Sequence, residues 1–327
     1  MTVKDRFIKV FNGETDADRL PMIEWATWWD LTLKRWDKEG LPMDTEHDAR
    51  FAALGLDLHQ QVWFPHRSRN LPGDMRIADK EDYAAMKPYL YPLEECEPSF
   101  ELMARYKARH AAGKLAEWFT LEGGFWFPRT LFGITAHLYS FYDEPDLYHR
   151  ILEDLAEYEL KLLERLYQID TPEFMTFAED MSYNNGPMIS EKMFDEFLLP
   201  FYNRVVPFIK AHGTKIIVDS DGDITNMVPW LIRAGFDGAL PLEYQAGVDI
   251  AKIRRLYPDF IMIGGFNKRV MKDGEAAMRR EFERILPVMR SGRYIPSVDH
   301  QTPPDVSLEQ YRVYIELLKE YCALPQK

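Results

Sequence analysis

Cysteine is scarce in this chain of 327 residues, which contains only Cys96 and Cys322, far apart in the sequence. Two distant cysteines exclude a disulfide framework and a Cys-x-x-Cys metal knuckle. Long apolar runs are also missing: no window approaches a membrane span, and the N-terminus lacks the apolar core of a signal peptide. We therefore expect a cytoplasmic protein that does not interact with membranes.

Basic residues are outnumbered, because 40 lysines and arginines face 53 aspartates and glutamates, for a formal net charge of −13. A protein that binds nucleic acid neutralises phosphates with clustered Lys and Arg, and this chain has no long basic run. The balance argues against a nucleic-acid partner. The hydrophobic fraction of 46%, with 14% aromatic residues, is instead typical of a globular enzyme-sized chain with a large core.

Short apolar runs alternate with longer amphipathic stretches along the whole chain. The eight runs are 22–26, 56–64, 116–124, 174–182, 215–223, 236–243, 260–267 and 293–300. Strands that are apolar throughout and separated by helices indicate a parallel sheet covered on both faces, and eight such strands predict an α/β fold of the (β/α)8 TIM barrel type. An open doubly wound sheet is the alternative.

The largest departure from this alternation is the segment 65–115, which is rich in proline and charge. We interpret it as an N-terminal insertion after the second strand, an excursion near the barrel mouth made of a hairpin followed by helices. The prediction is therefore a single barrel domain over 1–327. Such insertions often shape an active-site entrance, and a surface elaboration without a role is the alternative.

Acidic residues gather at the predicted C-terminal ends of the strands, where barrel enzymes place their chemistry. The residues at these ends are Glu24, Glu122, Glu179, Asp180, Asp219, Asp221, Asp223, Glu243, Asp299 and His300, with Lys268 after the seventh run. One such acid alone is usually a helix cap or turn former. Several carboxylates in one pocket repel one another and need a metal ion, shared protons or a cationic ligand.

Aromatic residues form a second concentration near the same ends. Trp25, Trp28 and Trp29 follow the first run, and Trp126 follows the third. Trp28 and Trp29 cannot both face one way on a helix, so one is expected to pack inward while the other lines the mouth. An aromatic wall over an acidic floor suits an aromatic ether or an organic cation, and does not suit a polyanion.

Six segments together give the chain its resemblance to a known family. They are VKDRFIKVFNGETDADRLP, GITAHLYSFYDEPDLYHRILE, ISEKMFDEFLLPFYNRVVPFIKAHGTKIIVDSDGD, AGFDGALPLEYQAGVDIAKIRRLYP, IGGFNKRVM and SVDHQTPPDVSLEQYRVYIELLKEY. With these motifs the chain resembles the uroporphyrinogen decarboxylase superfamily, which includes the cobalamin-linked methyltransferases acting on coenzyme M. The resemblance runs nearly end to end and implies a (β/α) barrel.

Two departures from the family pattern affect the expected function. The decarboxylases carry an arginine-rich RQAGR-like motif for tetrapyrrole carboxylates, whereas this chain reads EWATWWDLTLKRW after the first run. The methyltransferase branch holds zinc with a His-x-Cys pair and a further Cys, and the corresponding positions here are Asp219, Asp221 and His300. The resemblance thus implies a divalent metal, zinc or another, on an oxygen-rich set suited to polarising a substrate oxygen.

The leading hypothesis is a methyltransferase or demethylase of the corrinoid-dependent branch, acting on a small methoxylated, aromatic substrate. The predicted catalytic residues are Asp219, Asp221, His300, Glu179 and Asp180, and the predicted substrate-binding residues are Glu24, Trp25, Trp29, Glu122, Trp126, Glu243 and Lys268. The chain shows no cobalamin-binding DxHxxG motif, so the corrinoid would come from a separate partner protein. The sequence leaves a homodimer open.

Two other functions remain open at this point. The first is a decarboxylase or lyase on a small carboxylic acid, with Lys268 or Arg129 holding the substrate carboxylate. A cation in the pocket separates this chemistry from methyl transfer out of an ether, which does not need one. The second is a non-catalytic binding protein or corrinoid chaperone, which the loss of all thiolate ligands would favour.

Overall fold

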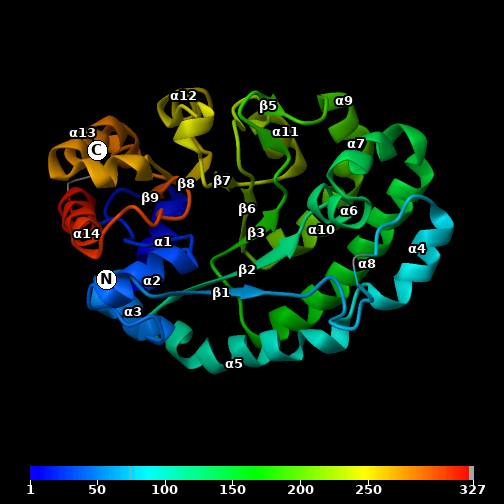
Figure 1. Cartoon of the computed structure of the whole chain (residues 1–327), viewed down its shortest axis with the longest axis horizontal. Coiled ribbons are helices and arrows are strands. Elements are labelled where there is room, and N and C mark those ends of the chain that lie inside the picture. The colour runs from blue at the N-terminus through cyan, green and yellow to red at the C-terminus, as the bar shows by residue number, and fades with distance from the viewer. Residues whose placement is uncertain (74, 324–327) are drawn as a thin grey trace.

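The centre of the molecule is a curled sheet of seven parallel strands (Figure 1). The computed structural model describes residues 1–73 and 75–323. The strands are β1 (His59–Trp63), β2 (Ala116–Glu122), β3 (Phe174–Ala178), β6 (Lys215–Asp219), β7 (Gly238–Leu240), β8 (Ile261–Phe266) and β9 (Tyr294–Val298). They pair in chain order from β1 to β9, and every neighbouring pair is parallel. Seven of the eight predicted strands and the barrel-like α/β class are therefore confirmed.

Helices separate the strands and cover the outside of the sheet, as a parallel order requires. The α-helices are α1 (Val3–Asn12), α2 (Asp30–Lys38), α3 (His47–Leu54), α4 (Lys80–Met86), α5 (Glu97–Ala111), α6 (Trp126–Phe132), α7 (Ile134–Asp143), α8 (Pro145–Ile169), α9 (Glu191–Met193), α10 (Leu199–Ala211), α11 (Val228–Ala234), α12 (Ile250–Leu256), α13 (Glu275–Met289) and α14 (Leu308–Cys322). Within residues 1–73 and 75–323, no helix combines the length and apolar composition that crossing a membrane requires.

The prediction of a first strand at 22–26 is wrong, because this segment forms no ladder with its neighbours. It nevertheless lies between the two edges of the sheet. The His59 ring on β1 donates from Nε2 to the Glu24 carbonyl at 2.9 Å, and the Trp25 indole donates to the Val298 carbonyl on β9 at 2.8 Å. Side-chain hydrogen bonds thus replace the backbone ladder where the barrel closes.

Helix α1 closes the end of the barrel opposite the predicted site. Lys4 N–H donates to the Gly113 carbonyl just before β2, and the Arg293 guanidinium, just before β9, donates to the Phe11 carbonyl. The Phe11 ring also packs edge-on against Phe174, the first residue of β3, at 5.4 Å between centroids. These contacts all lie at strand beginnings, so α1 covers the end of the barrel where the strands begin. The opposite end, where the strands terminate, is the end at which barrel enzymes place their active sites.

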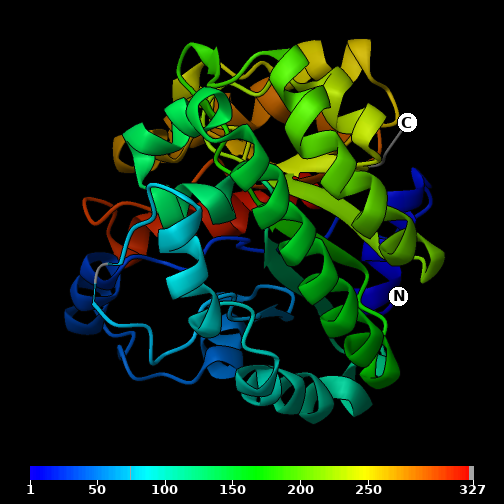
Figure 2. The ribbon, with the colours of Figure 1, turned by 90° about the vertical axis from the view of Figure 1, so that its right-hand side faces the viewer.

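The segment 65–115, predicted to be an excursion from the barrel, connects β1 to β2. Arg67 and Leu90 form an isolated antiparallel bridge; α4 lies between these two residues in the sequence, and α5 follows the second of them. In Figure 2 its cyan helices lie beside the long green helix α8. The Tyr83 hydroxyl on α4 donates to the buried Asp154 carboxylate on α8 at 2.8 Å, which ties the excursion to the barrel.

Candidate functional site

His300 and Asp221 meet at the C-terminal ends of the strands. Nε2 of His300, two residues after β9, lies 3.6 Å from Oδ2 of Asp221, two residues after β6. Contact with the Asp221 carboxylate raises the pKa of His300 above its ordinary value. The Trp25 ring stands edge-on to the imidazole, with 6.3 Å between centroids. The structure thus places an imidazole, whose protonated form the neighbouring carboxylate stabilises, beside an aromatic side chain.

Asp180 and Asp219 add two carboxyl groups to this pair. The Glu179 and Asp180 N–H groups both donate to the Asp219 carbonyl, and the Asp221 N–H donates to Oδ1 of Asp180 at 3.3 Å. Burial, reinforced by neighbouring carboxylates, raises the pKa of Asp219 well above its ordinary value and raises that of Asp180 as well. Carboxyls held in this way keep protons to higher pH than exposed ones do.

The turn after β6 depends on a glycine. Gly222 has φ of 84°, and a Cβ at this position would lie 2.6 Å from the Tyr183 backbone in the hairpin of β4 (Ser182–Tyr183) and β5 (Gly186–Pro187). The Gly222 N–H donates to Oε2 of Glu243 at 2.9 Å. Close packing of the hairpin on this turn brings the loops after β3, β6 and β7 together.

Glu179 is fully buried beneath the loop after β2 rather than exposed in the site. Its Oε2 accepts from the Phe125 and Trp126 N–H groups at 2.8 and 3.1 Å, while Oε1 has no partner. Burial raises the pKa of Glu179 to about 8. A Cβ on Gly123 would lie 1.9 Å from Oε1, so a glycine is needed there. Glu179 therefore anchors a loop, and a catalytic role for it stays a prediction.

Glu24 is also buried, and both of its oxygens are engaged. Oε1 accepts from the Ser297 hydroxyl at 3.0 Å and Oε2 from the Tyr311 hydroxyl at 2.8 Å. Burial raises the pKa of Glu24 to about 8. These hydrogen bonds connect the segment that lies between β9 and β1 to β9 and to α14. The observed role of the Glu24 carboxyl is therefore to hold this closing segment in place.

Lys268, predicted to bind substrate, pairs with a strand-end carboxylate. Its Nζ lies 3.2 Å from Oδ1 of the fully buried Asp299, and its own N–H donates to the same oxygen. Oδ2 of Asp299 has no partner, and burial raises the pKa of this carboxyl. The positive charge of Lys268 is thus paired with the Asp299 carboxylate inside the protein.

The remaining predicted substrate residues differ in their surroundings. Glu122 at the end of β2 is paired with Arg67, and Trp126 lies under the Arg129 guanidinium at 5.0 Å from the ring centroid. Trp28 packs inward, as one of the two tryptophans was expected to do. Trp29 is 45% exposed, and the contacts of the described residues do not bring it to the Asp221–His300 pair.

Sequence reasoning missed a buried histidine–carboxyl pair behind the site. Nε2 of His66 lies 3.2 Å from Oε1 of Glu159 on α8, and both side chains are fully buried. Burial raises the pKa of Glu159 well above its ordinary value and lowers that of His66 to about 3. Burial thus favours the uncharged form of both side chains. Glu159 lies within an amphipathic helix pattern, where the sequence holds no signal of such a partner.

The predicted metal ligands Asp219, Asp221 and His300 are not assembled as a ligand set. Among the described residues, the one group of three candidate ligands whose ligand atoms all lie within 4.8 Å of one another is elsewhere. The three predicted residues are not among the groups that meet this distance, so a metal on them stays a prediction, and the proposed reaction has no step that passes through a metal.

The group that does meet this distance is His110, Glu117 and Asp170, at the strand-beginning end of the barrel. Lys4 already supplies a cation there, with Nζ 3.0 Å from Nε2 of His110 and 3.1 Å from Oε1 of Glu173. Because α1 covers this end, the group is remote from the Asp221–His300 pair.

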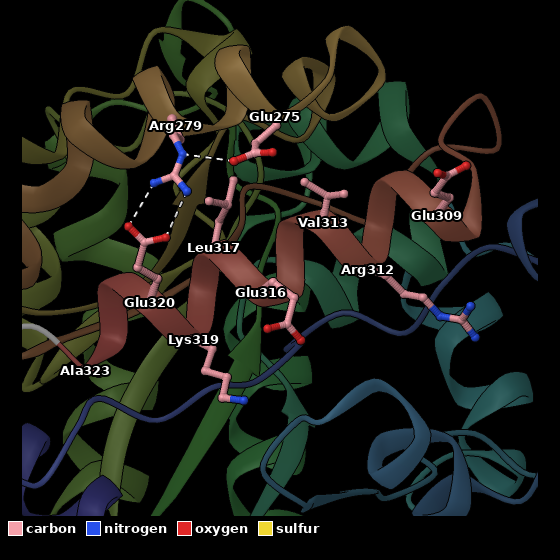
Figure 3. Close-up of a pocket in the computed structure, with 10 residues that line it drawn as sticks. All are labelled: Glu275, Arg279, Glu309, Arg312, Val313, Glu316, Leu317, Lys319, Glu320 and Ala323. Atoms are coloured by element: carbon pink, nitrogen blue, oxygen red, sulfur yellow. Dashed lines mark hydrogen bonds and ion pairs between the residues drawn. The ribbon is translucent and has the colours of Figure 1, made fainter.

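Two cavities lie near the surface in quite different places. One, of about 660 Å³, lies between α13 and α14 on the outside of the barrel, next to the ion pair of Arg279 with Glu320 (Figure 3). The other, of about 630 Å³, is lined by Trp126 and Arg129 and therefore borders the loops that carry Glu179 and Asp180. Only the second of these two adjoins the strand ends.

Comparison with known proteins gives a family match and distant structural likenesses. A family model described as Uroporphyrinogen decarboxylase (URO-D) matches residues 129–321. No curated protein matches the chain. Among solved structures, a putative vitamin-B12 independent methionine synthase from Listeria monocytogenes is similar at 11% identity, with 94% of this chain and 96% of that chain covered and a TM-score of 0.48.

Two further structures are more remote. A B12-independent methionine synthase from Shewanella sp. W3-18-1, in complex with selenomethionine, has 11% identity, covers 68% of this chain and 65% of its own, and has a TM-score of 0.35. A Flavobacterium johnsoniae chitobiase is 9% identical; the match covers 93% of this chain and 51% of the chitobiase chain, with a TM-score of 0.36. Since all three scores are below 0.5, functional conclusions rest on the residues of this chain.

Proposed function

Because the chain belongs to the uroporphyrinogen decarboxylase family, whose model matches more than half of it, we propose that it is an enzyme of the methyl-transferring branch of this superfamily. In this proposal it removes the methyl group from a small methoxylated substrate. The observation that carries the proposal is the Asp221–His300 pair beside the raised-pKa carboxyls of Asp180 and Asp219.

A methyl ether reacts slowly because the alkoxide or phenolate that is released from the methyl group is a poor leaving group. In the proposed reaction the bond between the ether oxygen and the methyl carbon breaks, the methyl group goes to an external nucleophile, and the oxygen takes a proton. His300 in its protonated form is the proposed donor, held by Asp221. A positioned general acid of this kind contributes roughly 10²- to 10⁴-fold to a rate.

The buried carboxyls serve the same step in a second way. Asp219 carries a raised pKa, so it keeps its proton to higher pH than an exposed carboxyl does, and in its protonated form it does not oppose the approach of an electron-rich nucleophile. Trp25, beside the imidazole, offers a face for an aromatic substrate. We propose that the methyl acceptor is a corrinoid carried by a separate protein.

Decarboxylation of a small acid is the second candidate, and one observation favours it. Arg129 donates to the Asp180 carbonyl at 3.0 Å, which puts a guanidinium next to the acidic cluster. This is the cation that would hold a substrate carboxylate. The same proton donor, His300, would then protonate the carbon from which CO2 leaves.

An anaerobic assay separates the two candidates. Purified protein is incubated with methoxylated aromatic compounds and reduced free cob(I)alamin, and both methylcobalamin and the demethylated phenol are quantified. We expect both products in equal amounts with the wild-type protein and at most about one hundredth of the rate with His300→Gln. Release of CO2 from those methoxylated compounds that carry a carboxyl group, without formation of methylcobalamin, would instead support decarboxylation. Methyl transfer that is unchanged in His300→Gln would refute the proposed proton donor.

A further inference from the structure

The cavity of about 630 Å³ beside the acidic cluster is built by two parts of the chain that are distant in sequence. The excursion contributes Arg67, Met75 and Arg76, and the loops and helices after β2 contribute Trp126 and Arg129. Its volume is in the range of small-molecule sites. The excursion therefore has a definite place in the molecule, as one wall of this cavity.

The charged side chains among the described lining residues of this cavity are all arginines. Arg67, Arg76 and Arg129 line it, and none of its described lining residues carries a carboxylate, in a chain whose formal charge is −13. Arg67 is compensated from behind by Glu122. Among the described lining residues, the positive charge that is not paired with a carboxylate comes from Arg76 and Arg129, and it favours an anionic ligand.

Arg129 connects the cavity to the proposed reaction centre. Its guanidinium lies over the Trp126 ring, 5.0 Å from the centroid, and one of its N–H groups donates to the Asp180 carbonyl. A guanidinium has five N–H donors in a planar fork, so this bond leaves others for a carboxylate or phosphate. The stacked ring holds the plane of the fork in place.

The first turn of α7 adds a further source of positive potential. Gly133 precedes this ten-residue helix, and no side chain caps its N–H groups. Gly133, Ile134 and Thr135 line the cavity, and the Arg76 guanidinium reaches this turn, because a Cβ on Gly133 would lie 3.5 Å from Nε of Arg76. Free N–H groups at a helix start and an arginine together suit an oxyanion.

The rest of the wall is apolar. Leu71, Met75, Met86, Leu131 and Ile134 complete it together with the Trp126 ring. A small inorganic anion would leave this surface in contact with water, whereas an anion on an aromatic or aliphatic body would cover it. The lining therefore fits an amphipathic molecule of modest size.

We propose that this cavity is the subsite for an oxyanion, carboxylate or phosphate, on the substrate, with Arg76, Arg129 and the first turn of α7 as its ligands. The assignment rests on the proposed function, because it places the anionic end of the molecule whose ether is cleaved near His300. It also gives the excursion a role in specificity: Arg76 selects charged substrates over neutral ones of the same shape.

Calorimetric titration with three probes tests this subsite. The probes are 4-methoxybenzoate, phenyl phosphate and the neutral 4-methoxybenzamide. We expect one or both anions to bind at least about tenfold more tightly than the amide, and Arg76→Gln to remove most of that preference while leaving amide binding unchanged. The two anionic arms show whether the oxyanion is a carboxylate or a phosphate.

Arg69→Gln is the matched control, because Arg69 is exposed on the same excursion and does not line the cavity. Equal binding of amide and anions, or an Arg76→Gln protein that keeps the full preference, would overturn the subsite. A failure of methyl transfer with intact, Arg76-dependent anion binding would overturn the proposed function alone. Methyl transfer from 4-methoxybenzoate with an unchanged KM in Arg76→Gln would overturn the subsite alone.

Discussion

The His300 imidazole and the Asp221 carboxylate, 79 positions apart in the sequence (300 − 221), lie 3.6 Å apart at the open end of the barrel. They come from the loops after β9 and β6, which are three places apart in the sheet order. Curling of the sheet brings these strand ends to one centre. The pair leads directly to a pH prediction.

Activity that requires protonated His300 falls as pH rises through the pKa of this group, which Asp221 holds above its ordinary value. Asp221→Asn removes the negative charge, so the pKa of His300 falls and the alkaline limb of kcat/KM moves to lower pH. A shift of roughly one unit corresponds to about 1.4 kcal/mol. The pH profiles of both proteins check this, with the His300 imidazole titrated by NMR as an independent readout. An Asp221→Asn profile that coincides with wild type contradicts it.

Stability should decrease from about pH 5 to pH 8 partly because of Glu179. Its pKa is raised from the ordinary 4.5 to about 8 in the folded protein, so over this range the unfolded chain loses a proton that the folded one keeps. Glu179→Gln cannot ionise, and its loss of stability over this range should be smaller by about 1–3 kcal/mol. Denaturant unfolding at both pH values measures the difference. Glu164→Gln, at an exposed position of α8, is the control that should behave as wild type.

Barrel closure at Glu24 can be tested with two tyrosines of α14. Tyr311→Phe removes the hydroxyl that donates to Oε2 of Glu24 at 2.8 Å and should cost about 1–3 kcal/mol of unfolding free energy. The Tyr314 hydroxyl is buried without a partner, so Tyr314→Phe should be neutral or stabilising. Equal effects of the two substitutions in urea unfolding would show that the bond to Glu24 does not hold the closing segment.

Chelation tests whether Asp219, Asp221 and His300 hold a shared ion. After dialysis against a strong chelator we expect unchanged methyl transfer in the proposed assay. Elemental analysis before and after dialysis reports any bound metal. Loss of activity that returns with zinc, together with loss of the bound zinc in Asp219→Ala, would mean that the three side chains rearrange to bind the ion.

Much of the architecture follows from local pattern. The apolar runs became seven parallel strands because each is flanked by amphipathic helices that cover both faces. The convergence of acids followed too, since the carboxyl ends of parallel strands meet at one end of a barrel. The strand prediction for residues 22–26 is wrong because an apolar run indicates burial and does not by itself indicate strand pairing. This segment is held by side-chain hydrogen bonds that involve His59 and the Val298 carbonyl, and not by a backbone ladder.

Local sequence pattern specifies the class of fold and the end of the barrel where polar residues collect. The surroundings of each of these side chains depend on the tertiary structure. Glu179 turns inward because Gly123 leaves room, and burial together with two neighbouring carboxyls raises the pKa of Asp219. The arginine-lined cavity exists because the excursion packs against α7. Side-chain direction, desolvation and charge depend on neighbours that are distant in the chain, so local periodicity does not encode them.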